Sequence, residues 1–176
     1  MGLDISFLRF KRSEYQRYNE DVQKWLDKKP KSASMSNDEF EKLSPEKQAV
    51  VEEEIGKWHE TRPDTDDYGM EDIGYFRKVN FLVQFFGYEE NCEDKEITIE
   101  EVTDLLERCR EILKHNSKKK AEALLPTQSG FFFGSTDYDK WYFGDVKEVR
   151  DWCKGIIASV KDHPTEDYIL LMNCWW

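Results

Sequence analysis

Residues 3–10 have the sequence LDISFLRF, in which apolar side chains recur at every second position. Leu3, Ile5 and Phe7 fall on one side of an extended chain, which predicts a β-strand with a buried face. Leu8 interrupts the polar side of the segment, so we expect the second face to be at least partly covered. A strand at the start of the chain needs a partner strand from elsewhere in the sequence.

The other end of the chain contains a second apolar segment. Residues 167–175, DYILLMNCW, are apolar enough to form a strand that is covered on both faces. A third, short strand is expected at residues 131–133, FFF, where Gly134 ends it. Because two apolar strands cannot be stable alone, we expect the terminal strands to pair with each other or with the 131–133 strand in one small sheet.

Helical spacing of apolar residues covers most of the remaining sequence. We expect helices over residues 14–28, 37–43, 45–61, 71–86, 99–115 and 137–161. The segment 71–86 carries two neighbouring apolar stripes, so it is predicted to be the central buried helix. Thr98 and Glu101 have the spacing of a capping box at the start of the helix over 99–115. The lysine-rich residues 116–122 are expected to form a basic turn.

Together these elements predict an α+β fold in a single domain, with five to six helices packed on a small sheet that includes the N- and C-terminal strands. The length of 176 residues suits one domain over residues 1–176. Within that domain, about residues 31–70 are expected to form an acidic helical elaboration.

Charge and hydropathy exclude several classes of protein. The chain has 26 basic and 37 acidic residues, a net charge of −11, which disfavours nucleic acid as a direct partner. No apolar run approaches the ~20 residues that span a bilayer, so no membrane segment is expected. Charged residues interrupt the first dozen positions, which argues against a secretory signal. We therefore expect a cytoplasmic protein.

The cysteines and histidines lack the spacing of a metal or redox site. Cys92, Cys109, Cys153 and Cys174 are too far apart for a CxxC motif and are expected to be reduced thiols. The three histidines are also too scattered to be ligands, so we expect no metal and no cofactor. No GxSxG, HExxH or P-loop motif is present, so no catalytic residue is identified and a protein without enzymatic activity is favoured.

Negative charge is concentrated in one part of the chain. Residues 31–74 hold 5 basic and 13 acidic residues, a net charge of −8 out of the total of −11. Much of this charge lies in two acidic clusters, which consist of Glu52, Glu53 and Glu54 and of Asp64, Asp66 and Asp67. The clusters form either a solvated helix side and a polar loop, or an acidic surface that attracts a basic partner.

Four blocks of the sequence resemble a known family. They are MGLDISFL at 1–8, IGYFRKVN at 73–80, NCED at 91–94 and LPTQSGFFFGSTDYDKWYF at 125–143. They are similar to blocks of a group of uncharacterised proteins from bacteriophages and prophage-bearing bacteria. That group typically opens with MGLDMYL, carries a GYWRKAN helix and an LPTxxGFFFGSxxYDxWY segment, and ends in a strand with a terminal Trp. The resemblance implies a phage or prophage setting but no catalytic mechanism.

The chain departs from that family in one helix. Val83 stands where the family usually has a histidine. A catalytic role for that histidine could not operate in this protein.

The glycine-rich block before the last expected helix is a candidate ligand site. Gly134 and Ser135 could present backbone N–H groups to a phosphate at a helix N-terminus. Asp137 would fall in the first turn, where its carboxylate compensates the helix dipole and repels an anion. Ser135 or Thr136 as a helix cap explains the same residues without a ligand.

Arg77 and Asn80 form a second candidate site, because residues three apart are neighbours on a helix. A basic residue on the apolar helix expected over 71–86 needs a partner, since a buried unpaired charge is costly. Asp4, Asp137 or Asp139 could pair with Arg77 in a structural ion pair. The alternative is a polar pocket for a small anionic ligand, lined by Tyr75, Arg77, Asn80, Gly134, Ser135, Asp137 and Tyr138.

Three hypotheses of function follow. The first is a non-enzymatic phage or prophage accessory protein whose acidic surface binds a basic surface of a host protein, with antagonism of host defence as one such role. The second is a protein that binds or sequesters a small anionic, nucleotide-like ligand. The third is an enzyme of unrecognised class. An open cleft lined by Arg77 and Asp137 would favour the second or third hypothesis, whereas their neutralisation inside the core would favour the first.

Overall fold

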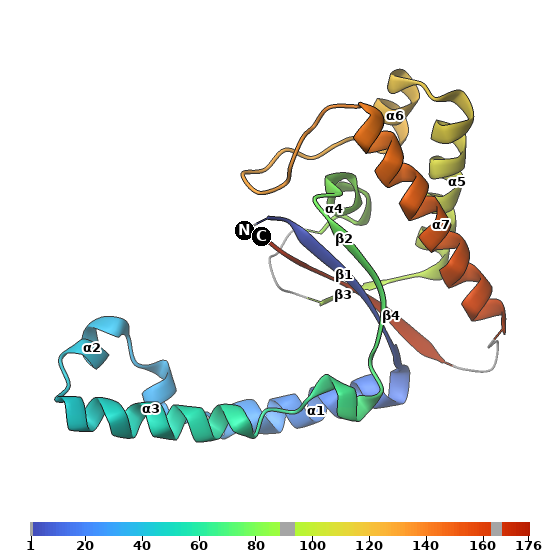
Figure 1. Cartoon of the computed structure of the whole chain (residues 1–176). Helices are drawn as coiled ribbons and strands as arrows, with labels where there is room; N and C mark the ends of the chain where they lie inside the picture. The colour runs from blue at the N-terminus through green and yellow to red at the C-terminus, as the bar shows by residue number, and fades with distance from the viewer. Residues whose placement is uncertain (1, 89–93, 163–166) are drawn as a thin grey trace. The chain divides into compact units, whose positions relative to one another are not determined.

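The structure is a computed structural model that describes residues 2–88, 94–162 and 167–176 (Figure 1). Its strands are β1 (Asp4–Lys11), β2 (Glu71–Arg77), β3 (Asp94–Ile97) and β4 (Tyr168–Trp175). Its α-helices are α1 (Arg12–Asp27), α2 (Asn37–Glu41), α3 (Pro45–Glu60), α4 (Asn80–Phe86), α5 (Ile99–His115), α6 (Lys118–Leu124) and α7 (Lys140–Asp162). Short 3₁₀ helices occupy Lys31–Ser34 and Thr65–Tyr68.

The four strands form one antiparallel sheet in the order β2-β1-β4-β3. β1 and β4 pair over their whole length, with Asp4 opposite Trp175 and Lys11 opposite Tyr168. The predicted α+β fold, with both terminal strands in one small sheet, is therefore confirmed. Of the two pairings left open by the sequence, the terminal strands pair with each other.

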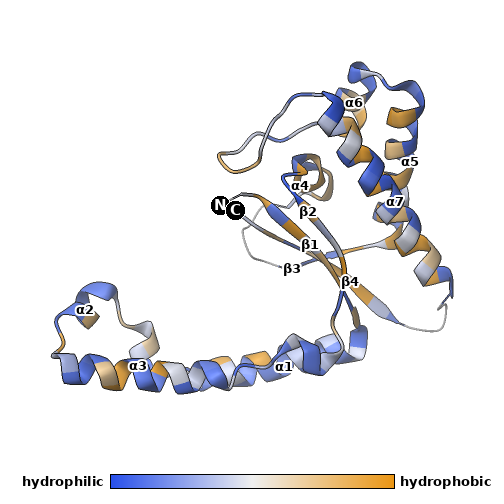
Figure 2. Cartoon of the chain, viewed as in Figure 1, coloured by the Kyte–Doolittle hydropathy of each residue, from blue (hydrophilic) through white to orange (hydrophobic). Residues whose placement is uncertain are grey.

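One face of the sheet is buried by helices. Phe7 of β1 is fully buried and packs against Trp152 of α7 and Phe86 of α4, with ring centroids 4.3 and 5.8 Å away. The hydrophobic core takes members from all four strands and from α4, α5, α6 and α7, and none from residues 12–70. Figure 2 shows the hydrophobic residues of the strands and of the helices near them.

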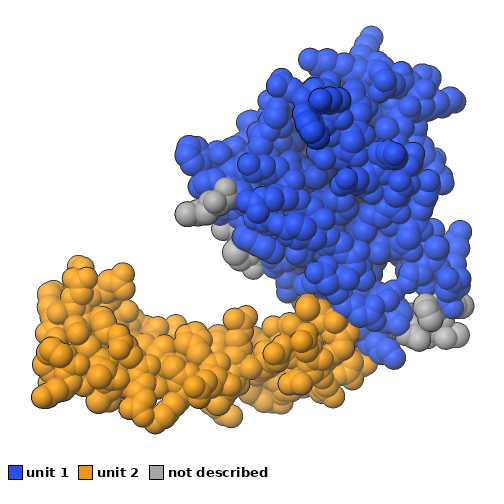
Figure 3. Space-filling view, in the orientation of Figure 1, with its two compact units in different colours: residues 1–11, 71–176 blue, residues 12–70 orange. Residues whose placement is uncertain are grey.

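The described residues divide into two compact units (Figure 3). Unit 1 consists of Met1–Lys11 and Glu71–Trp176, and unit 2 consists of Arg12–Met70. Unit 2 is inserted between β1 and β2, which are neighbours in the sheet. The acidic elaboration expected at about 31–70 lies within unit 2, which begins at Arg12.

The prediction of a helix over residues 71–86 is wrong for the first half of that range. Residues 71–77 form strand β2, and α4 covers only residues 80–86. In β2, Phe76 is buried and its neighbour Tyr75 is 52% exposed, which is the alternation of a strand. Backbone pairing with β1 decides between strand and helix here, because apolar residues in this segment fit both periods.

Two shorter predictions are also wrong. Residues 131–133 form a turn and no strand, with Phe131 95% exposed and Phe133 buried. The expected basic turn at 116–122 contains most of helix α6, whose Ala121 is buried in the core. In contrast, the capping box of Thr98 and Glu101 is confirmed in both of its hydrogen bonds.

The cysteines that the structure describes are core residues. Cys109, Cys153 and Cys174 are buried free thiols, as predicted, and Cys92 lies outside the described residues. Burial raises the pKa of Cys153 and of Cys174 to about 12, so both remain protonated at neutral pH. Within the described ranges, none of the helices has both the length and the hydropathy to span a bilayer.

Gly74 tests the packing of β2 against α7. A Cβ at this position would lie 2.5 Å from Nε1 of Trp152, and this nitrogen donates a 2.8 Å hydrogen bond to the Ile73 carbonyl. We expect Gly74→Ala to displace the indole and to lower the free energy of unfolding by about 2 kcal/mol. Gly155→Ala, at an exposed α7 position with open space, is the control and should stabilise by ~0.5–1 kcal/mol. Chemical denaturation measures both, and equal effects would contradict the packing argument.

Candidate functional site

Unit 1 contains a cavity of about 230 Å³ between the β2–α4 junction, the loop before α7 and the first turns of α7. Its lining residues are Arg77, Lys78, Asn80, Phe81, Thr127, Gly134, Ser135, Asp137, Asp139, Trp141, Tyr142 and Asp145. Three segments that are far apart in the sequence therefore line one cavity.

Lys78 sits at the sharp turn from β2 into α4. Its φ of 62° is in the left-handed region, which is unfavourable for a residue with a side chain. Its backbone N–H donates to the Leu3 carbonyl at 2.8 Å, so β1 holds this turn. A Cβ on Gly134 would lie 3.1 Å from the Lys78 Cβ, and one on Gly2 would lie 3.2 Å from its Cε. The lysine stem therefore runs between two glycines, and larger residues there would crowd it.

Asn80 fixes the loop that forms the opposite wall. Its side chain is 2% exposed and donates to the carbonyls of Phe133 and Ser135 at 3.1 and 2.9 Å. Its carbonyl oxygen accepts from the Gln128 N–H at 3.3 Å. Because these contacts use both ends of the amide, Asn80 positions the loop and has little capacity left for a ligand.

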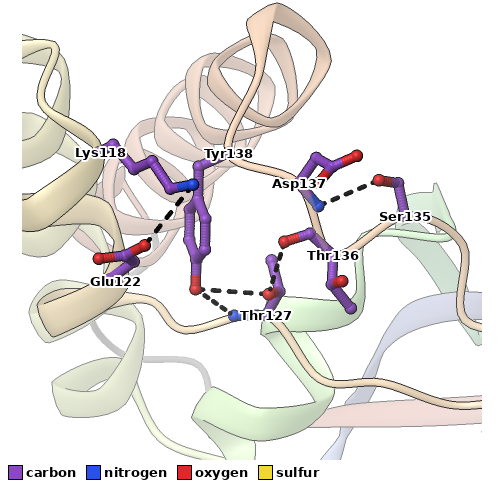
Figure 4. Close-up of polar contacts among 7 residues, drawn as sticks. All are labelled: Lys118, Glu122, Thr127, Ser135, Thr136, Asp137 and Tyr138. Atoms are coloured by element: carbon purple, nitrogen blue, oxygen red, sulfur yellow. Dashed lines mark hydrogen bonds and ion pairs between the residues drawn. The ribbon is translucent and has the colours of Figure 1, made fainter.

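A second set of contacts closes the loop on itself (Figure 4). The Thr127 N–H donates to the Tyr138 hydroxyl at 3.1 Å, and the Thr127 hydroxyl donates to the Thr136 carbonyl at 3.2 Å. The Ser135 hydroxyl accepts from the Asp137 N–H at 3.0 Å. Tyr138 thus supports the loop through Thr127 and is not among the lining residues.

The N-terminus of α7 is capped by Asp139. One carboxylate oxygen accepts from the N–H groups of Trp141 and Tyr142 at 2.9 and 3.2 Å. The cap is therefore Asp139, and the predictions of Ser135 or Thr136 as the cap are wrong. Because the protein's own carboxylate occupies these N–H groups, they do not form the phosphate cradle considered from the sequence.

Arg77 lies at the end of β2, and of the three partners that the sequence left open, Asp4, Asp137 and Asp139, it forms an ion pair with Asp4. The Arg77 Nη1 is 3.6 Å from the Asp4 carboxylate, which is nearly buried and also accepts a hydrogen bond from the Tyr75 hydroxyl. The hydrogen bond to Asp4 raises the pKa of Tyr75 above its ordinary value. Tyr75 therefore belongs to this ion-pair cluster and does not line the cavity.

Asp145 has the most unusual electrostatics in the cavity. Burial, reinforced by the nearby charges of Glu148 and Asp139, raises its pKa to about 6. The Asp145 carboxyl group therefore binds its proton more tightly in the folded protein than in the unfolded chain. The contribution of Asp145 to stability is therefore lost as the pH rises from 3.8 towards about 6, and its carboxylate is a cost at neutral pH.

The sequence identified part of this cavity. Arg77 and Asp137 are both exposed and line it together, which is the outcome that we expected to favour a ligand-binding protein or an enzyme. Of the residues predicted for a ligand pocket, those that line the cavity are Arg77, Asn80, Gly134, Ser135 and Asp137, whereas Tyr75 and Tyr138 do not. The missed residues include Trp141 and Asp145, which are four positions apart and so share one side of α7. That spacing was the available signal.

The acidic clusters lie in unit 2, and their side chains are exposed. Glu53 forms a 2.5 Å ion pair with Lys57, and Glu54 accepts from the Ser32 hydroxyl at 2.6 Å. Asp64 caps the following 3₁₀ helix by accepting from the Asp66 N–H at 3.1 Å. Within the described ranges, the remaining carboxylates of the clusters, those of Glu52, Asp66 and Asp67, form no hydrogen bond or ion pair.

Unit 2 has almost no interior. None of the residues in its helices and 3₁₀ helices is buried. Large apolar side chains remain accessible, including Leu26 at 43% and Val50 at 65% exposure. A folded segment with this little burial has surface that a partner could cover.

Comparisons of the chain with protein-family models, with curated proteins and with solved structures find no match. Among the residues that the structure describes, no group of His, Cys, Asp and Glu side chains has the arrangement of a metal site.

Proposed function

We propose that the protein is a non-enzymatic binding protein that uses unit 2 to engage a basic surface of a host protein. The observation that supports this proposal most directly is that the helices of unit 2 fold without a buried residue. Apolar side chains that remain accessible, such as Val50, lose contact with water when a partner covers them, and this burial favours association.

The charge of unit 2 indicates which kind of surface the partner has. The acidic clusters are exposed on the same unit as the accessible apolar residues, and part of their charge is unpaired there. A surface of this kind attracts and orients a partner that carries lysine and arginine. The attraction acts through solvent, so association should slow as ionic strength rises.

The biological setting comes from the sequence resemblance alone. A phage or prophage protein that binds a host protein at a basic groove would block whatever that groove normally binds. Antagonism of a host-defence system is the role that we propose for such a protein.

Reversal of one acidic cluster tests this function. Glu52→Lys, Glu53→Lys and Glu54→Lys together should weaken binding to the captured host partner at least about tenfold, or ~1.4 kcal/mol, because attractive contacts become repulsive. Pull-down from bacterial lysate followed by titration of the identified partner measures the effect.

The matched control reverses three exposed glutamates of unit 1, namely Glu107, Glu122 and Glu148. Each Glu→Lys exchange adds two charges, so both triple variants move the net charge from −11 to −5. The control should retain the partner. Equal loss in both variants would show that net charge alone drives capture, and full retention in both would contradict the proposal.

A further inference from the structure

We propose that the cavity of unit 1 is a binding site for a small zwitterion, a molecule of about amino-acid size that carries one anionic and one cationic group. The proposal is independent of unit 2. It starts from two charged side chains of opposite sign that line the same cavity and that have no partner within the described residues.

The first of these groups is the Lys78 ammonium. The lysine stem is held between Gly2 and Gly134, as described above, and the backbone is held in a strained conformation by β1. No carboxylate of the described residues forms an ion pair with it. Lys78 is exposed, and a cation without a counter-charge at the wall of a cavity is suited to an anionic group of a ligand.

The second group is the Asp145 carboxylate on α7. It is partly buried and forms no hydrogen bond or ion pair within the described part of the chain. Its raised pKa has the same origin, since burial and like charges act on it without a compensating cation. An ammonium group in the cavity would supply that cation.

The cavity separates these two charges. No ion pair joins Lys78 to Asp145, so their charged atoms are more than 4.0 Å apart although both line the same space. A single small molecule with two opposite charges could therefore pair with both Lys78 and Asp145. Its anionic group would meet Lys78 and Arg77, and its cationic group would meet Asp145 and Asp137. Trp141, which is 70% exposed, offers an aromatic face to the rest of the molecule.

The same residues argue against a phosphate or nucleotide ligand. The carboxylates of Asp137, Asp139 and Asp145 line the cavity alongside the cations of Arg77 and Lys78, so an anion alone would face repulsion. The volume of about 230 Å³ is also below the ~300–1,000 Å³ of sites for drug-sized ligands.

Differential scanning fluorimetry and calorimetry of the full-length protein with the free amino acids test the proposal. Each amino acid is compared with its N-acetyl and its amide derivative, which lack one of the two charges. We expect at least one free amino acid to raise Tm by about 5 °C at a hundredfold excess over Kd, and its derivatives to give no comparable shift.

Two variants locate the site. Lys78→Met keeps the stem and removes the charge, and Asp145→Asn keeps the shape and removes the charge. Each should weaken binding about 10- to 100-fold. Asp145→Asn should also raise Tm of the free protein at pH 7, because an uncompensated carboxylate is removed, and this gain separates lost binding from misfolding. Lys147→Met and Glu100→Gln, at exposed positions that do not line the cavity, are the controls and should bind normally.

Three results would overturn the proposal. They are the absence of a shift with every free amino acid, equal binding by singly charged derivatives, and unchanged binding in both variants. Binding of a nucleoside monophosphate in place of the amino acids would also contradict it. None of these outcomes bears on the partner of unit 2, whose test uses different residues.

Discussion

Replacement of Trp58 by alanine is expected to unfold unit 2 and to leave unit 1 folded. Trp25 at the end of α1 and Trp58 at the end of α3 stack with ring centroids 4.1 Å apart and an interplanar angle of 1°. Each indole N–H donates to the backbone carbonyl of the other tryptophan, at 2.9 and 3.0 Å. This reciprocal pair joins the C-terminal ends of the two long helices of the unit.

The expected effect is large because little else holds these helices. Truncation of a packed tryptophan costs about 3 kcal/mol, and here the hydrogen bond from the Trp58 indole N–H to the Trp25 carbonyl is lost with the ring. A unit whose helices contain no buried residue has no core to compensate.

Limited proteolysis within residues 12–70 and near-ultraviolet circular dichroism measure the loss, and the thermal transition of unit 1 should persist. Trp141→Ala is the control, because this indole is 70% exposed and lies in unit 1. Cleavage of the Trp58→Ala variant at the wild-type rate would show that the tryptophan pair is not the main support of unit 2. Because its unit 2 is unfolded, the Trp58→Ala variant should also bind the host partner poorly.

Removal of unit 2 is the second prediction with a large effect. Replacement of Arg12–Met70 by a short turn of the Asn-Gly type should give a protein that folds as unit 1 and no longer binds the host partner. β1 and β2 are antiparallel neighbours, with Arg9 opposite Glu71 and an ion pair between their side chains. Chain ends that meet in this way can be joined by a tight hairpin.

The hydrophobic core supports the same expectation, because none of its members comes from residues 12–70. Cooperative thermal unfolding of the shortened protein, with a retained circular dichroism spectrum, would confirm that unit 1 is independent. Titration with the host partner should show no binding, whereas any amino-acid ligand of the cavity should still bind. A shortened protein that fails to fold would contradict the independence of unit 1, and one that still captures the partner would contradict the proposed role of unit 2.

The terminal strands were predictable because the local sequence pattern and the tertiary structure favour the same conformation there. The alternation from Leu3 to Phe7 has the period of a strand, and the apolar run from Tyr168 to Trp175 is short enough to favour a strand over a helix. The capping box of Thr98 and Glu101 was predictable for a related reason, since both of its hydrogen bonds are made within one turn of chain.

The segment 71–86 was mispredicted because its apolar residues satisfy two periods. Phe76 is buried in a strand and Phe86 in a helix, and the change between them occurs at Lys78, whose positive φ no sequence pattern announces. The strand prediction for residues 131–133 failed for a different reason. Their three aromatic side chains favour a strand, yet Phe133 packs into the core while Phe131 remains exposed. The Phe133 carbonyl is bonded to the Asn80 side chain and takes no part in strand pairing.

The candidate cavity also has features that the sequence predicted and features that it did not. Its polar residues in 77–80 and 134–137 were visible as short motifs, and so was the pairing of Arg77 with Asp4. The unpaired states of Lys78 and Asp145 were not visible, because the absence of a partner depends on the positions of all neighbouring side chains.

By itself, the amino-acid sequence determined the fold class, the terminal strands, the capping box of Thr98 and Glu101 and the concentration of negative charge. Each of these depends on residues close together in the chain or on composition. Only the tertiary structure decided that residues 12–70 form a unit without a core and that β2 replaces half of a helix. It also decided which charges in the cavity remain unpaired, because burial and pairing are set by contacts between segments far apart in sequence.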